Sequence, residues 1–518
     1  MIFLEKAKKK RRALLIAVLA MAVAVLCLSP GAQAATPEEI EAAIAKGLTW
    51  LVAQQAGNGS FPGYYPIANT AAAVLKLEDR AKELGYNSPF DPSYPYKTNV
   101  ENGLTYLLSQ AHLSGTQVWW EYYGSKTTYH TALGIMAIVS STTPDTVVAS
   151  GPLSGLTYGQ VVTYALNFLL ARQNPDGGWI YTSGGGSDQS NTGFAGLGLA
   201  YANSWGNTLP AATINGLKNW NAYIQCTSGD VTTNGGAGYT SPCYWVNAYK
   251  TGHLLYNMAL VGDGAGNPAV QAAITYIANN WNDTNNIGWR YYGGTPDMLS
   301  CFMVMKGLVG QGIERINVGG NPNFDWFDDM STVLVNTQQV NGNWVGNYWT
   351  DDLLTTVFAL LTLEKTIIKP FVSAYFDIKP GYCPNVLNIG GKIKRKAALY
   401  TAVCGLENFD VRDIDPDTIR LSREDNPDLF MTPTKVGYRD VATPYEGSEE
   451  CGCTTERGDG YMDLVILFNL QTLISELELN YETGNTVPLV LTANLTEEAG
   501  GMQIIGRDCL VISGGQAK

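Results

Sequence analysis

The sequence predicts a multidomain protein: an all-α region of six helical hairpins, closed into a double ring, followed by a β-rich, sandwich-like domain. Three observations carry this prediction. They are a sixfold internal repeat, the pairing of an amphipathic helix with an apolar helix in each unit, and a change to β-branched runs after Pro370. We divide the chain into an export signal (1–34), a helical region (35–369) and a β-rich region (370–518).

The first 34 residues have the organisation of a secretory signal peptide. The basic start EKAKKKRR precedes a run of sixteen apolar residues, and Ala32-Gln33-Ala34 forms a small-x-small cleavage site. The apolar run is shorter than the roughly 20 residues that span a bilayer, so a retained anchor is the less favoured alternative. We expect a secreted or cell-surface protein with no stable membrane insertion after cleavage.

The composition excludes one class of partner. The chain has a formal net charge of −13, and it becomes more acidic once the basic signal is removed. Because phosphate binding needs a basic face, nucleic acid is not expected as a partner. Gly (56) and Tyr (29) are abundant, which is typical of a rigid, aromatic-rich extracellular protein.

Eight cysteines follow the signal, and an oxidising compartment favours their pairing. Cys226 and Cys243 flank one Gly-rich loop and are predicted to form a disulfide, whereas Cys301 lies in an apolar helical run and is predicted to be a buried thiol. The pairing of the five C-terminal cysteines stays open. No Cys/His cluster with zinc spacing is present, and we expect no cofactor.

A phrase made of Gln, three residues, Gly, one residue and a large aromatic recurs at 55–61, 173–179 and 338–344. An amphipathic helix precedes each copy, and three related helices lack the full phrase. Aligned on one position, the six helices are spaced 52 to 62 residues apart. The six amphipathic segments are 47–55, 103–110, 165–173, 216–225, 273–281 and 331–339.

A second helix of a different kind follows each amphipathic helix. These helices are apolar nearly all round and rich in Ala and Gly, as a helix buried on every side must be. Alternating outer and inner helices close most simply into a double ring, and an open superhelix of helical pairs is the alternative. The predicted inner helices are 69–78, 130–140, 191–202, 251–260, 297–310 and 351–365.

The Gln-x-x-x-Gly-x-Trp phrase between an outer and an inner helix resembles the repeat of the squalene cyclase and protein prenyltransferase superfamily. The resemblance covers residues 38–365, with full matches at Gln173–Trp179 and Gln338–Trp344. It implies a terpenoid cyclase-like α/α toroid with a pocket at one mouth. It also implies that the phrase is structural, with Gln capping helix ends and the aromatic stacking on the neighbouring hairpin.

In that superfamily, functional residues gather where the inner helices begin. The matching positions here are Asn69, His130, Asn191, Thr251, Asp297, Asp351 and Asp352. The alternative is that these residues cap helix N-termini, since Asn, Thr and Asp are good caps. Capping accounts less well for the Asp351–Asp352 pair, because one cap needs only one carboxylate.

The two family reactions can be tested on the sequence. Zinc-dependent prenyl transfer needs an Asp, a Cys and a later His, and although Asp297 and Cys301 are four apart, the last repeat reads NYWTDD without His. Triterpene cyclisation uses an Asp-x-Asp-Asp stretch, and the nearest string, DWFDD at 325–329, has one residue too many. We expect neither reaction, and retained isoprenoid chemistry stays an alternative.

Three segments combine aromatic and acidic residues near the expected mouth: VWWEYY (118–123), GWRYY (288–292) and NYWTDD (347–352). Aromatic faces suit stacking on sugar rings, and two carboxylates about 5–10 Å apart suit glycoside hydrolysis. The alternative is that the aromatics pack hairpin against hairpin. The candidate acids are Glu121, Asp297, Asp351 and Asp352. The candidate binding residues are Trp119, Trp120, His130, Asn191, Arg290, Tyr291 and Trp349.

Two other functions therefore stand beside isoprenoid chemistry. The first, which we favour, is a toroid whose mouth binds an extracellular polymer or cell-surface partner, without prenyl transfer. The second is a secreted polysaccharide-degrading enzyme.

Past Pro370, β-branched runs alternate with Pro, Gly and Asn turns, which predicts a β-rich, sandwich-like domain. Three stretches, DIKPGYCPN (377–385), ENFDVRDIDPDTIRL (407–421) and RGDGYMDL (457–464), resemble a module at the ends of secreted microbial proteins. ERGDGYMDL resembles half of a calcium loop, in which only Asp459 and Asp463 are available as ligands. We favour a plain turn at this position and expect no metal.

Overall fold

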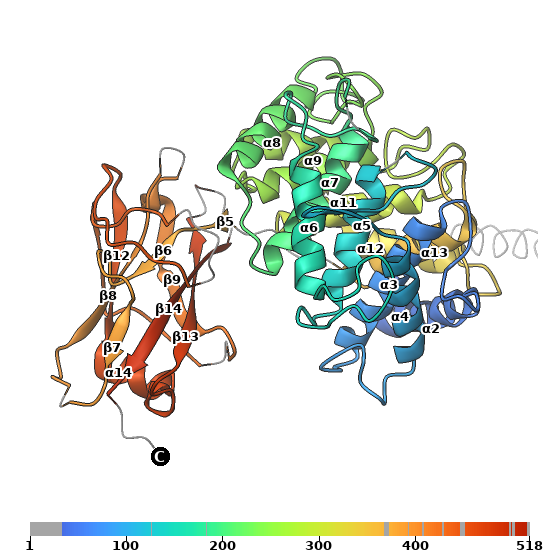
Figure 1. Ribbon diagram of the computed structural model, residues 1–518. Coiled ribbons are helices and arrows are strands. Elements are labelled where there is room, and N and C mark those ends of the chain that lie inside the picture. The colour runs from blue at the N-terminus through green and yellow to red at the C-terminus, as the bar shows by residue number, and fades with distance from the viewer. Residues whose placement is uncertain are drawn as a thin grey trace, which may run out of the picture.

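The computed structural model describes residues 34–125, 127–182, 184–366, 372–391, 393–406, 409–426, 429–445, 451–496, 499 and 503–514. The predicted export signal lies outside the described residues, apart from Ala34. A helical region and a β-rich region form separate bodies (Figure 1). Within the described ranges, no helix combines the length and the apolar character needed to cross a membrane.

The helical region alternates two kinds of helix, as the sequence predicts. The first kind buries one face only, and the second is buried almost all round. The half-buried helices are α2 (Pro37–Val52), α4 (Lys97–Ser109), α6 (Tyr158–Leu170), α8 (Ala211–Ile224), α10 (Pro268–Asn279) and α12 (Trp326–Thr337). The buried helices are α3 (Pro66–Glu83), α5 (Thr127–Ser140), α7 (Gln189–Ser204), α9 (Ala248–Leu260), α11 (Met298–Gly310) and α13 (Asp352–Leu363).

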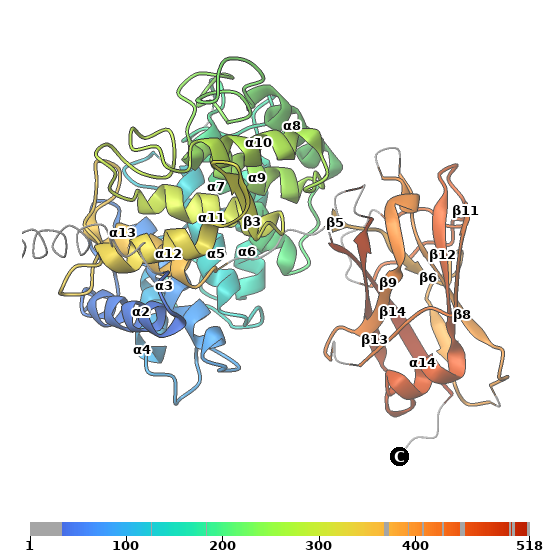
Figure 2. The same cartoon turned by 180° about the vertical axis from the view of Figure 1, so that it is seen from behind.

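The six buried helices contact one another in a closed cycle. α3 packs on α5, α5 on α7, α7 on α9, α9 on α11, α11 on α13, and α13 returns to α3. The half-buried helices lie against this cycle from outside, as Figure 2 shows from behind for α2, α10 and α12. The apolar all-round composition of the buried helices follows from this position, because each has protein on every side.

The glutamine of the repeated phrase joins neighbouring hairpins. Gln173 Nε2 donates to Gly177 O at 2.9 Å within its own loop and to Thr213 O at 3.0 Å in the next half-buried helix. Gln55 makes the equivalent pair of bonds to Gly59 O and Asn99 O. In the last repeat, Gln338 donates to Ala43 O at 2.8 Å, which links the sixth hairpin to the first.

The aromatic residue of the phrase is buried between helices. The Trp179 side chain has no exposed surface, and its Nε1 donates to Leu169 O at 2.8 Å. Trp344 makes the matching bond to Leu334 O. Because a buried indole N–H needs an acceptor, this bond fixes the ring against the preceding helix. The phrase is therefore part of the packing of the hairpins, with its glutamine bridging to the next hairpin and its aromatic ring bonded to the preceding helix.

The β-rich region consists of two sheets that share one apolar core. Leu421 and Leu491 of one sheet and Ile466 and Phe468 of the other belong to the same buried cluster. The first sheet has the order β10-β9-β13-β14-β5, with β7 also on β14, and the second has the order β11-β12-β8-β6.

The strands of the first sheet are β5 (Val372–Ser373), β7 (Val386–Asn388), β9 (Ile414–Arg423), β10 (Phe430–Met431), β13 (Thr486–Leu495) and β14 (Gln503–Ser513). The strands of the second are β6 (Phe376–Ile378), β8 (Ala398–Val403), β11 (Lys435–Arg439) and β12 (Asp463–Asn469). A short helix, α14 (Leu470–Glu476), follows β12.

Two short hairpins in the helical region were not predicted. They are β1–β2 (His112–Ser114 and Gln117–Trp119) and β3–β4 (Arg315–Val318 and Asn321–Asp325).

Three disulfides are present among the described residues. Cys226 pairs with Cys243, as the sequence predicts, and the β-rich region contains Cys383–Cys453 and Cys451–Cys509. Cys301 is a buried free thiol, also as predicted. Disulfides of this number are typical of proteins that fold in an oxidising compartment.

The β-rich region is expected to lose stability as the pH rises. Burial raises the pKa of Asp377 to about 7, with Asp508 and Asp463 adding to the effect, and burial raises the pKa of Asp508 to about 6. Because the folded state holds these protons more tightly than the unfolded chain, the stability they confer is present in acid. It is lost as the pH rises through about 6 to 7.

Asp377→Asn removes the buried charge, so we expect it to raise the free energy of unfolding at pH 8 on the order of 2 kcal/mol. Below about pH 3, where the carboxyl is mostly protonated in both states, the variant and the wild type are expected to agree. Denaturant unfolding at the two pH values measures the difference. The exposed Asp417→Asn is the control, and an equal gain at both pH values would contradict the account.

Candidate binding site at one end of the helical region

The loops that lead into the buried helices are joined to one another, which places them at one end of the helical region. Gln189 N donates to Tyr239 O, and Ala248 N donates to Ile287 O, each at 2.8 Å. Asn347 Nδ2 donates to Asp297 Oδ1 at 3.0 Å. We call this end, formed by the loops before α3, α5, α7, α9, α11 and α13, the mouth.

Aromatic side chains gather at the mouth, and several are exposed. The Trp245 and Trp349 rings lie 6.1 Å apart although they come from different repeats, and each side chain is 46% exposed. Trp245 also contacts Tyr239, and Trp349 contacts Tyr348. We call the exposed set the aromatic rim. It consists of Tyr64, Tyr123, Tyr244, Trp245, Tyr292, Tyr348 and Trp349.

The loop that carries Trp245 is constrained. The Cys226–Cys243 disulfide ties it to the end of α8, and both Cys243 (φ 60°) and Trp245 (φ 52°) have left-handed backbone conformations. Such conformations are costly for residues other than glycine and are held in place only by the surrounding structure. The backbone at Trp245 is therefore constrained before any ligand arrives.

The carboxylate of Asp351 has a structural role. Asp351 caps α13 by accepting from Leu354 N, and its Oδ2 accepts from Tyr64 N at 2.8 Å and from Asn69 Nδ2 at 3.0 Å. These bonds join the last repeat to the first. Asp352 accepts from Gly346 N and from Asn343 Nδ2. Both acids of the predicted pair thus bind groups of the protein itself.

Asp297 is buried at the N-terminus of α11. Its Oδ2 accepts from Ser300 Oγ at 2.6 Å, and its Oδ1 accepts from Asn347 Nδ2. Burial raises the pKa of Asp297, and burial also raises the pKa of the Cys301 thiol well above its ordinary value. Within the described ranges, no three His, Cys, Asp or Glu residues are grouped as metal ligands.

Glu121 and Trp119 lie together beside α6. Glu121 Oε2 accepts from Trp119 Nε1 at 3.2 Å, and the Trp119 ring stacks on His112 and on Phe168. Trp120, the next residue, has no exposed surface, and its Nε1 donates to Leu107 O. The role of Trp120 in ligand binding stays a prediction, and the contacts favour its packing alternative, because Trp120 fills the position that Trp179 fills in the third repeat.

The other candidate binding residues are divided between the interior and the surface. His130 and Asn191 are buried, with the His130 ring stacked on Tyr122 and Asn191 Nδ2 donating to Asp188. Neither side chain reaches the surface, so neither is available to a ligand there. Arg290 lies over the Trp289 ring and 3.8 Å from Asp329, whereas Tyr291 is half-buried against Tyr292.

Two residues at the mouth were not predicted. Asp188, not Asn191, caps α7, and it accepts from Asn191 N and from Ser190 Oγ. Lys250 Nζ donates to Asn247 Oδ1 and lies 4.9 Å from the centre of the Trp245 ring. Burial lowers the pKa of Lys250 to about 7, and Asp188 opposes that shift. An acidic residue three positions before Asn191 was the available signal for the cap.

The two weak calcium candidates are held by backbone groups. Asp463 is fully buried and accepts from Gly405 N, Val441 N and Ala442 N. Asp459 accepts from Tyr461 N. A cation at this position would have to displace the donors of Asp463, so the contacts favour the turn.

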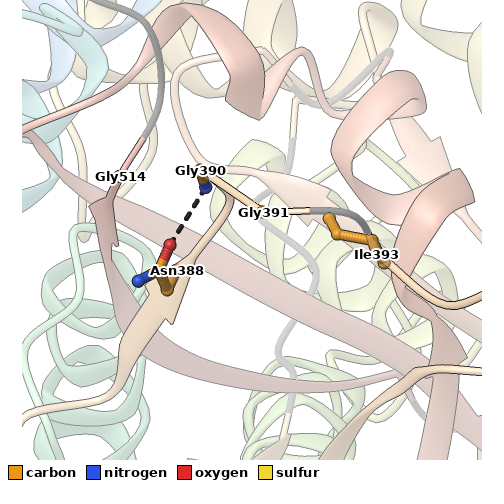
Figure 3. A pocket seen from close by; sticks show the side chains of 5 residues that line it. All are labelled: Asn388, Gly390, Gly391, Ile393 and Gly514. Carbon is orange, nitrogen blue, oxygen red and sulfur yellow. Dashed lines mark hydrogen bonds between the residues drawn. The ribbon is translucent and has the colours of Figure 1, made fainter.

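A cavity of about 490 Å³ lies where β7 and β14 end (Figure 3). It is lined by Asn388, Gly390, Gly391, Ile393 and Gly514, and Asn388 Oδ1 accepts from Gly390 N at 3.0 Å. None of these five side chains is charged or nucleophilic, so the cavity offers no catalytic group.

Comparisons with known proteins give structural likenesses only. No protein-family model matches the chain, and no curated protein matches it. The type II terpene cyclase MstE from Scytonema is similar over 63% of this chain and 98% of its own, with a TM-score of 0.40 and 11% identity. MstE in complex with the substrate geranylgeranyl dihydroxybenzoate gives a TM-score of 0.42 and 12% identity, over 63% of this chain and 97% of that chain.

Alpha-2-macroglobulin from Escherichia coli is similar over 76% of this chain and 74% of the crystallised fragment, with a TM-score of 0.28 and 11% identity. Likenesses of this size carry no inference about substrate or reaction.

Proposed function

We propose that the helical region is a six-hairpin α/α toroid whose aromatic rim binds an extracellular polysaccharide, without prenyl transfer. The single observation that supports this function most is the Trp245–Trp349 pair. Two indole rings from different repeats lie 6.1 Å apart and half-exposed at the mouth. Exposed aromatic patches of this kind are typical of binding sites.

The chemistry of the rim suits an uncharged polymer of sugars. The rings of the aromatic rim present flat apolar faces, which pack against the C–H faces of sugar rings. The nearby carboxylates of Asp297 and Asp351 accept hydrogen bonds from other residues of the same chain. Neither carboxylate is therefore an unpaired charge at the rim. We further propose that the protein is secreted, which the three disulfides favour.

The same contacts weigh against the alternatives. Hydrolysis needs two free carboxylates facing one bond, yet Asp351 accepts three hydrogen bonds from the protein and Glu121 lies beside α6. For isoprenoid cyclisation, the nearest acidic string contributes Asp325, which caps α12 by accepting from Phe327 N and Asp328 N.

A double variant tests the proposal. We expect Trp245→Ala with Trp349→Ala to weaken retention on a bound polysaccharide at least tenfold, since hot-spot aromatics contribute about 2 kcal/mol or more each. The thermal midpoint is expected to change little, because both side chains are half-exposed. Tyr223→Ala on α8, with a ring that is 50% exposed, is the matched control. Equal retention by the double variant and the wild type would remove the aromatic rim as the binding site.

A further inference from the structure

A second cavity of about 620 Å³ lies in the β-rich region, beside the sheet formed by β11, β12, β8 and β6. Three cationic side chains line it: Lys379 just after β6, Arg439 at the end of β11, and Arg457 in the loop before β12. Two tyrosines, Tyr382 and Tyr400, line it as well. We propose that this cavity binds an anionic sugar unit, one that carries a carboxylate or a sulfate group.

The cations of the cavity have no carboxylate partner among the described residues. Lys379 Nζ donates to the backbone oxygen of Val386 at 2.7 Å, and no ion pair in the described ranges includes Lys379, Arg439 or Arg457. The one acid in the lining, Asp440, accepts from Gly460 N. In a chain with a net charge of −13, a group of three unpaired cations is a local field that attracts an anion.

The aromatic lining adds a surface for a ring. Tyr382 is 55% exposed, and Lys379 Nζ lies 5.1 Å and Arg457 Cζ 5.9 Å from the centre of its ring. A sugar ring can contact the exposed part of Tyr382 while its acidic group reaches the guanidinium groups. Arginine binds carboxylate and sulfate oxygens through two parallel N–H donors, which favours an anion of this shape over a neutral sugar.

The segment that carries Tyr382 is held rigidly. The Cys383–Cys453 disulfide ties it to the loop that leads to Arg457. Lys379 has a left-handed backbone (φ 61°), and a Cβ at Gly381 (φ 82°) would lie 2.5 Å from Arg457 Nε. Side chains fixed before binding lose little conformational entropy when a ligand arrives. The backbone that carries Lys379, Tyr382 and Arg457 is therefore preorganised on one side of the cavity.

Calorimetric titration of the full chain with tetragalacturonate, and with sulfated and carboxyl-reduced neutral oligosaccharides of equal length, tests the proposal. We expect saturable binding of at least one anionic oligosaccharide and at least tenfold weaker binding of the neutral one. Binding of tetragalacturonate assigns the site to carboxylates, and binding of the sulfated oligosaccharide alone assigns it to sulfate.

Arg457→Gln and Tyr382→Ala are each expected to weaken the anionic binding at least tenfold. The control is Arg420→Gln on β9, which removes a guanidinium group that lies over the Phe430 ring of β10. We expect this variant to bind the anionic oligosaccharide as the wild type does. Binding that persists in the Trp245→Ala and Trp349→Ala double variant separates this site from the aromatic rim. Neutral and anionic oligosaccharides binding equally, or Arg457→Gln binding like the wild type, would overturn the proposal.

Discussion

Trp344→Ala is expected to lower the free energy of unfolding of the helical region by about 3–5 kcal/mol, the usual cost of deleting a fully buried indole. The Trp344 side chain is 1% exposed, and its Nε1 donates to Leu334 O at 2.8 Å. Its ring lies against Gly47 of α2, where an added Cβ would be 3.1 Å away. The deletion therefore leaves a cavity between the last hairpin and the first.

Denaturant unfolding followed by far-ultraviolet circular dichroism measures this loss. Trp349→Ala, five positions along the chain, is the matched control. Its side chain is 46% exposed, and the expected loss is below about 0.5 kcal/mol. Losses of equal size for the two variants would contradict the assignment of Trp344 to packing and Trp349 to the surface.

Glu364→Gln is expected to cost about 3–5 kcal/mol, the range measured when one partner of a buried ion pair is removed. Glu364 follows α13 in the last repeat and pairs with Lys76 and with Arg80 of α3 in the first, the Arg80 pair at 3.1 Å. The side chains of Lys76 and Glu364 are at most 1% exposed. Removing the negative charge deprives the buried Lys76 ammonium group of its direct ion-pair partner, whereas Arg80 keeps Glu41 and Glu83.

This variant also distinguishes a closed ring from an open superhelix, because α3 and α13 would lie far apart in an open arrangement. Thermal and denaturant unfolding of Glu364→Gln measure the effect. Glu101→Gln, which breaks an exposed pair with Lys97, is the control and is expected to cost below about 0.5 kcal/mol. A Glu364→Gln variant as stable as the wild type would argue against ring closure.

The helices were predictable because the periodicity that reports them is local. A segment that is apolar on all sides indicates a helix that is buried on all sides. The helices α7 and α9 begin within three residues of their predicted starts. The phrase in the fourth repeat was not predictable. Gln225 bonds to Gly235 O and Ala269 O as the other phrase glutamines do, but its glycine lies ten residues away and the spacing hides the match.

The candidate site was less predictable than the helices. Aromatic residues of the same type point into the core at some positions and toward the surface at others, and the sequence does not show which way each one points. Trp119 and Trp120 are adjacent, yet Trp119, the last residue of β2, is half-buried against Phe168, whereas Trp120, one residue past the strand, has no exposed surface. Trp245 was missed for a related reason. Trp245 contacts Trp349, and the two residues lie in loops 104 positions apart in the sequence. No local sequence pattern predicts such a contact.

The measurement that tests the central proposal most directly is retention of the purified wild-type chain on a panel of insoluble polysaccharides, with an assay for newly released reducing ends. We predict retention on at least one polysaccharide, no release of ends, and loss of that retention in the Trp245→Ala and Trp349→Ala double variant. Release of ends would contradict a binding function and restore the hydrolytic alternative. Failure to bind any member of the panel would contradict polysaccharide binding at the mouth.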